Sequence, residues 1–114
     1  MGSSALELPD GRRIRLDKDG YLTRLSDWDI EVAEALASHE SISLTPEHWA
    51  VINLVRQFHQ EFGLSPATRP LVKYVGRHLG EDKGKSLYLM TLFGGKPALT
   101  ISRLGGLPRP ANCF

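Results

Sequence analysis

The chain has a single cysteine, Cys113, at the penultimate position of its 114 residues. A lone cysteine is most often a buried and inert side chain. This one follows two glycines, Gly105 and Gly106, which predict a hinge, and two prolines, Pro108 and Pro110, which fix φ near about −65° and favour an extended backbone. Such a segment leaves little structure around the thiol. We therefore predict a reactive thiol at the tip of a mobile C-terminal arm over residues 105–114.

An arm of this kind gives the thiol both reach and a local charge environment. Fully extended, Leu107 to Phe114 spans up to roughly 26 Å, enough to enter the active site of another protein. Free cysteine has a pKa of about 8.5, and neighbouring cations raise the fraction of thiolate at neutral pH. Six residues are accordingly candidates for shaping the arm or contacting a partner: Arg103, Arg109, Gly105, Gly106, Pro108 and Pro110.

The elements that position this arm are mainly helical. Alternating apolar residues over 6–22, with turn signals at Pro9–Gly11 and Asp19–Gly20, predict an N-terminal β-hairpin. Pro70 predicts an irregular turn or a distorted first helical turn over 65–69, and the nearly all-apolar segment 87–93 is expected to cross the core. The predicted helices run from Ser26 as N-cap to about His39, from Thr45 as N-cap to Phe62, from Leu71 to Leu79, from Leu87 to Phe93 and from Pro97 to Leu104.

Composition sets the class of protein. At 114 residues the chain is expected to form one domain, a small orthogonal helical bundle of α+β class with a hairpin and a flexible arm. A formal net charge of +1 gives no global field for nucleic acid or an anionic membrane. One cysteine excludes an internal disulfide and fits a reducing compartment. Since the apolar runs are short and the start lacks a signal-peptide layout, we expect a cytoplasmic protein.

Two apparent ligand motifs do not fit their usual patterns. The segment 80–86 resembles a phosphate-binding loop, but only three residues separate its glycines and it follows a predicted helix rather than a strand. The histidines His39, His48, His59 and His78 lack metal-ligand spacing. We expect His48 to pack in the first turn of its helix or to make a local hydrogen bond there.

A helix-turn-helix is the main alternative interpretation. Residues 47–62, the turn 63–66 and the helix that ends at Leu79 have suitable lengths, and Arg69, Lys73 and Arg77 recur every four residues. The net charge near zero favours a solvated charged face over a DNA reader. Helix lengths alone do not decide between the two.

The C-terminal segment Leu104–Phe114, with Gly-Leu-Pro-Arg-Pro and the penultimate cysteine, resembles the arm of the DsrC/TusE family of sulfur-relay proteins. The resemblance extends over roughly residues 6–114. Its further motifs, in chain order, are Asp17–Leu22, Trp28, Leu44–Trp49 with the helix to Phe62, Ser65–Ala67, Arg69, Leu71–Lys73, Leu87–Leu89 and Leu92–Phe93.

This resemblance implies that Cys113 accepts a sulfane sulfur as a persulfide and passes it to an acceptor cysteine. In the TusE branch, the donor is the TusBCD complex and the receiver is the tRNA-uridine 2-sulfurtransferase MnmA, for 2-thiolation of the wobble uridine. The resemblance implies no metal and no organic cofactor. It describes a monomeric carrier of sulfurtransferase type rather than a stand-alone enzyme, with no membrane partner and no direct contact with nucleic acid.

Two departures from the family pattern bear on the branch. DsrC proteins that work with dissimilatory sulfite reductase carry a second cysteine, which bridges a sulfur atom with the first. Here that position, with ten residues between it and Cys113, is Ser102, so the resemblance is to the single-cysteine, TusE-like branch. The sequence also differs from the pattern of many family members at two places, Leu99-Thr100 and Gly94–Pro97. A single-cysteine protein of another sulfur-oxidation or sulfite-reduction pathway therefore stays open as an alternative.

Overall fold

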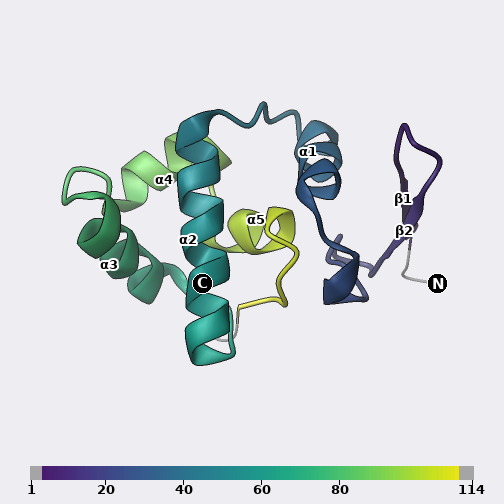
Figure 1. The fold of residues 1–114 in the computed structure, drawn as a ribbon. Helices are drawn as coiled ribbons and strands as arrows, with labels where there is room; N and C mark the ends of the chain where they lie inside the picture. The colour runs from purple at the N-terminus through teal and green to yellow at the C-terminus, as the bar shows by residue number, and fades with distance from the viewer. Residues whose placement is uncertain (1–3, 111–114) are drawn as a thin grey trace.

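The computed structural model describes residues 4–110, which form five α-helices and one two-stranded antiparallel hairpin (Figure 1). This confirms the predicted mainly helical fold with an N-terminal hairpin. Cys113, the predicted reactive residue, lies outside the described residues. Within residues 4–110, no helix is long and apolar enough to cross a membrane.

The hairpin places one apolar face on the helices. β1 (Ser4–Glu7) pairs with β2 (Arg13–Leu16), and Leu6 lies opposite Ile14 in the register. Both of these side chains are buried, whereas their neighbours along each strand are exposed. The alternation that predicted the strands is thus the alternation between core and solvent.

The first helix begins later than predicted. α1 spans Ile30–His39, and its N-cap is Asp29, whose carboxylate accepts a hydrogen bond from the Val32 amide at 2.9 Å. The expected cap, Ser26, lies instead in a short 3-10 turn, Leu25–Asp27. Trp28 has an extended backbone between these two elements, and its indole bonds the distant Leu104 carbonyl. The prediction from Ser26 was therefore wrong because a tertiary contact keeps Trp28 out of the helix.

The second helix, α2 (Pro46–Phe62), has the predicted bounds. The Thr45 side chain caps it together with His48, and Gly63 ends it with a positive φ of 74°. The His48 imidazole is buried and also hydrogen-bonds the Leu92 carbonyl at 2.8 Å. This confirms the predicted local role of His48 and adds a link from α2 to α4 (Ser86–Phe93).

Two further helices differ from prediction. α3 (Thr68–Leu79) begins three residues earlier than expected. Pro70 is its third residue, where the missing N–H would have had no partner within the helix, so the proline distorts nothing. α4 (Ser86–Phe93) does not cross the core: Leu89 and Phe93 are buried, but Leu87 is 72% exposed and Met90 41% exposed.

The central helix is α5 (Pro97–Leu104), which contacts α1, α2, α3 and α4 and lies between them in Figure 1. Its bounds match the prediction. Ile101 and Leu104 are fully buried. Because α5 is the last helix, the core itself determines where the C-terminal segment starts.

Candidate functional site at the base of the C-terminal tail

The first six residues of the predicted arm, which we call the tail base (residues 105–110), pack on the domain. Gly105, Gly106, Leu107 and Pro110 are buried, whereas Pro108 and Arg109 are exposed. The sequence predicted a free hinge followed by a semi-stiff arm. The mobility of the arm stays a prediction, but any movement of residues 105–110 must first break the contacts described below.

The two glycines complete the C-terminal cap of α5. The Leu107 amide donates to the Ser102 carbonyl at 2.9 Å, and the Gly106 amide donates to the Arg103 carbonyl at 3.2 Å. Gly106 has a φ of 69°. This combination is a Schellman motif, in which a left-handed residue allows the chain to satisfy the last carbonyls of a helix. The two glycines of the predicted hinge therefore form a helix cap in this structure, and hinge motion stays a prediction.

Two side chains from the first half of the protein hold this cap. The Trp28 indole N–H donates to the Leu104 carbonyl at 2.8 Å, and the Arg56 guanidinium donates to the Gly105 carbonyl. The Arg56 guanidinium carbon also lies 3.7 Å from the centroid of the Trp28 ring, within cation–π range. Burial lowers the pKa of Arg56. A β-carbon on Gly106 would overlap the Trp28 side chain, so only glycine fits there.

A third contact holds the chain beyond the cap. The Ser65 hydroxyl donates a hydrogen bond to the Pro108 carbonyl. Pro66 and Pro110 are both fully buried. Trp28 thus holds the end of α5 at Leu104. Arg56 and Ser65 hold the tail base at Gly105 and Pro108. Sequence reasoning did not assign these three side chains, and no local pattern signals contacts over such sequence separations.

The two predicted cations, Arg103 and Arg109, both have acidic partners. Arg103 makes two hydrogen bonds of 2.8 Å to the Glu40 carboxylate, which raise the pKa of Arg103. Arg109 lies 3.1 Å from the Asp19 carboxylate. These pairs offset much of the positive charge near the start of the tail. An effect of either arginine on the Cys113 thiol stays a prediction.

Tyr21 lies between these two arginines. Their guanidinium carbons are 5.8 Å (Arg103) and 5.7 Å (Arg109) from the centroid of its ring. The Tyr21 hydroxyl donates to the Leu99 carbonyl at 3.3 Å. Burial raises the pKa of Tyr21, although the two arginines act in the opposite direction. The ring therefore joins the hairpin side of the molecule to α5 and to the tail base.

Ser102, the position at which the resemblance implies a second cysteine in other proteins, faces the interior of the molecule. Its side chain is 1% exposed, and its hydroxyl has no hydrogen-bond partner within residues 4–110. Its carbonyl accepts the hydrogen bond that the Leu107 amide donates. The chain thus folds back over the last turn of α5, so that Leu107 meets the carbonyl of Ser102.

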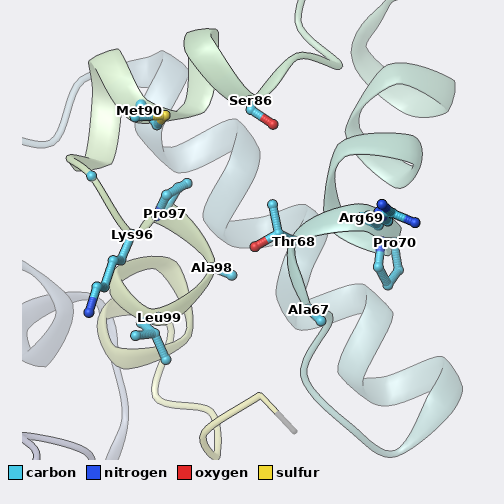
Figure 2. Close-up of a pocket in the computed structure, with 11 residues that line it drawn as sticks. Ala67, Thr68, Arg69, Pro70, Ser86, Met90, Lys96, Pro97, Ala98 and Leu99 are labelled. Carbon is cyan, nitrogen blue, oxygen red and sulfur yellow. The ribbon is translucent and has the colours of Figure 1, made fainter. Parts of the chain in front are cut away.

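A groove of about 830 Å³ opens between α3, α4 and α5. Figure 2 shows Thr68 and Ser86 reaching into it from one side, with Pro97 and Ala98 on the other. Sequence reasoning did not predict this groove. The signal that could have found it is the residue type at three helix starts: Ala67, Lys85 and Lys96 are at N-cap positions and supply no capping side chain.

The cations of α3 and the residue types that bind metal ions are the remaining candidates for a site. Arg69, Lys73 and Arg77 are exposed on α3, as the helix-turn-helix alternative requires, and equally as a solvated face requires. Across residues 4–110, no group of three or more His, Cys, Asp or Glu side chains lies close enough to hold a metal ion.

Comparison with known proteins agrees with this architecture. The family described as "DsrC like protein" matches residues 9–114. A sulfurtransferase TusE homolog from Haemophilus influenzae is 49% identical over 105 residues, which cover 92% of this chain and 96% of the relative. The sulfurtransferase TusE of Escherichia coli K12 is 45% identical over the same shares of the two chains.

Solved structures lead to the same family. The NMR structure of Allochromatium vinosum DsrC superposes with a TM-score of 0.88 and 41% identity, covering 98% of this chain and 99% of that one. The crystal structure of the oxidized γ-subunit of dissimilatory sulfite reductase (DsrC) from Archaeoglobus fulgidus gives 0.84 and 38%, covering 97% and 100%. The resemblance inferred from the tail motif is therefore confirmed: this chain belongs to the DsrC-like family.

Proposed function

We propose that this protein is a sulfur carrier of the TusE type, in which Cys113 holds the transferred sulfur atom. The observation that carries the proposal is an identity of 45–49% over 92% of the chain to proteins named sulfurtransferase TusE or TusE homolog. The lone penultimate thiol, with Ser102 in place of a second cysteine, supports the single-cysteine branch.

The chemistry is a balanced exchange of sulfur. The Cys113 thiolate attacks the terminal sulfur of a donor persulfide, forming Cys113–S–SH and releasing the donor thiolate. An acceptor thiolate then attacks the same outer sulfur, and the Cys113 thiolate leaves. No external oxidant or reductant takes part, and no metal or organic cofactor is required. The protein is thus a transferase-type carrier that returns to its starting state.

We assign partners from the family branch. The donor is a TusBCD-like complex, and the acceptor is an MnmA-like tRNA 2-thiouridylase that modifies the wobble uridine in the cytoplasm. The carrier acts as a monomer and makes no direct contact with membrane or nucleic acid. A single-cysteine carrier in another sulfur-oxidation or sulfite-reduction pathway is the second candidate, favoured by the departures at Leu99-Thr100 and Gly94–Pro97.

Sulfur loading tests the carrier mechanism. Incubation with a cysteine desulfurase, free cysteine and the donor complex should add the mass of one sulfur atom to the intact protein, and a reductant should remove it. Cys113→Ser should abolish loading without loss of the fold. Ser102→Ala should load normally. A wild-type protein that gains no reducible sulfur from any persulfide donor would refute the carrier proposal.

Sulfur transfer tests the pathway. Labelled sulfur on Cys113 should pass to the tRNA 2-thiouridylase and then into tRNA. If the label passes only to a different acceptor, the carrier mechanism stands and the pathway assignment is wrong.

A further inference from the structure

The packed tail base limits where Cys113 can meet its partner. Pro108 is held by Ser65, and Pro110 is buried. Only three residues then lead from Pro110 to Cys113, a span of at most roughly 10 Å. With the tail base in place, a protein that exchanges sulfur with Cys113 must bring its own cysteine close to this part of the domain.

The groove between α3, α4 and α5 is connected to this point through the segment 65–67. Ser65 holds Pro108, and the groove begins two residues after Ser65, at Ala67. Figure 2 shows the tail passing below α5, near the side of the groove that Leu99 occupies. Most of the lining is apolar, and its apolar residues are Ala67, Pro70, Met90, Pro97, Ala98 and Leu99.

The groove also carries positive charge without a matching acid. Arg69 and Lys96 are exposed on its rim, and the described lining contains no Asp or Glu. In addition, α3, α4 and α5 all begin in this lining, and none of the three has a capping side chain. The amides of a helix's first turn lack partners in the helix and carry partial positive charge. The groove therefore suits a segment that brings carboxylates.

An apolar strip continues the groove onto the surface. Met90 lines the groove and is 41% exposed, and Leu87, one turn earlier on α4, is 72% exposed. Exposed apolar surface that is continuous with an apolar hollow is typical of an interaction site. Since Leu89 and Phe93 anchor α4 in the core, Leu87 and Met90 can contact a partner without any change in the core.

We propose that this groove, with Leu87 and Met90, binds the protein that receives sulfur from Cys113, through a segment of that protein carrying apolar and acidic side chains. This inference rests on the proposed function and names the surface that it uses. The cations at the groove favour a segment that carries carboxylates, and the short span from Pro110 requires an acceptor of sulfur to approach this part of the domain. A second copy of this chain and the chain's own residues 111–114 are the other occupants, which the tests below distinguish.

Kinetics of sulfur transfer test the groove. Met90→Asp and Lys96→Glu oppose an acidic, apolar segment, while Leu64→Asp and Lys73→Glu are matched controls on exposed residues outside the lining. Each variant is loaded with inorganic polysulfide, checked by circular dichroism and then mixed with subsaturating tRNA 2-thiouridylase. We expect equal loading, with transfer slowed about tenfold or more in the groove variants, a change of about 1.4 kcal/mol, and within about twofold of wild type in the controls.

Two measurements distinguish the proposed acceptor from the other possible occupants of the groove. If the groove holds the chain's own C-terminal residues, groove variants will speed alkylation of Cys113 by iodoacetamide and leave transfer unchanged. If it holds a second copy, wild type will sediment as a dimer and Met90→Asp as a monomer. Either result overturns the inference. Normal transfer by both groove variants overturns it while leaving the carrier function intact, whereas absence of any transfer by wild type overturns both.

Discussion

The two ends of α5 differ in how their backbone groups are satisfied. At the C-terminal end, the carbonyls of residues 101–105 accept hydrogen bonds from the chain itself, Trp28 and Arg56. At the N-terminal end, Lys96 supplies no cap, and the first turn lies in the groove. One end is closed by intramolecular contacts and the other is open. The closed end fixes the start of the tail, and the open end leaves polar groups for an intermolecular contact.

The largest loss of stability is expected from a substitution in the C-terminal cap of α5. Gly106→Ala places a β-carbon against Trp28 at a positive φ of 69°, so we expect the free energy of unfolding to fall by about 2–4 kcal/mol. Gly63→Ala is the matched control, because Gly63 ends α2 with a φ of 74° but has no neighbour near its β-position. It should lose only about 1 kcal/mol. Equal losses in urea denaturation would mean that Trp28 does not restrict the tail.

Removal of one hydrogen bond at the closed end should have a smaller effect. Trp28→Phe retains a ring beneath Arg56 but removes the N–H donor to the Leu104 carbonyl. We expect a loss of about 1–3 kcal/mol, since a buried carbonyl is left without its partner. Hydrogen exchange at the Gly106 and Leu107 amides should accelerate as well. Trp49→Phe, at a partly buried position of α2, should leave exchange at these amides unchanged; acceleration there too would point to a global effect.

Filling an open helix start should stabilise the protein. Ala67 has the extended backbone of an N-cap but no side-chain acceptor, so Ala67→Asp should raise the free energy of unfolding by about 0.5–1 kcal/mol. Its carboxylate would also oppose an acidic partner in the groove and slow sulfur transfer. Asp29→Ala, which removes the cap of α1, should have the opposite effect on stability. If Ala67→Asp gives no gain, the amides at the start of α3 are already satisfied.

The smallest effect concerns pH at a helix start that is already capped. The hydrogen bond from Arg12, followed by that from the Val32 amide, lowers the pKa of Asp29 below its ordinary value of 3.8. The associated stability is fully present above 3.8 and is lost as the pH falls through the lower pKa of the folded state. Asp29→Asn retains a capping oxygen and should flatten the acid side of the stability profile.

The size of this pH effect should be small, because the Asp29 side chain is 44% exposed and its ion pair is screened by solvent. Urea denaturation of wild type and Asp29→Asn across the acidic range measures the difference between the two profiles. Added salt should reduce that difference. Identical profiles at low salt would show that the Arg12 contact contributes nothing to stability.

Sequence reasoning succeeded where the determinants are local. Thr45, Pro46 and Gly63 define the ends of α2 through capping and backbone preference alone, and the structure reproduces these ends. The choice of Cys113 also rests on local context and on a family motif, and it stays a prediction. For such features, the chemistry of a few neighbouring residues is sufficient.

It failed where a distant side chain decides. Trp28 lies outside α1 because its indole hydrogen-bonds the Leu104 carbonyl, and the packing of Gly106 against Trp28 was not predicted. The all-apolar sequence of α4 has no periodicity from which to predict that Leu87 faces solvent. The groove needs three helix starts to meet in space, so it too could not be read from any one segment.

The bond between Ser65 and Pro108 has a consequence for selectivity among thiols. A sulfur atom on a long free arm would be exposed to every small thiol and to every cysteine that diffuses past. With the chain held at Pro108, the search volume of the last residues shrinks, and productive collisions depend on the lifetime of a complex between two complementary surfaces. If Cys113 carries sulfur as proposed, retention of the sulfur atom and choice of recipient both depend on the contacts that hold this segment, among them one hydroxyl group 43 residues earlier in the chain.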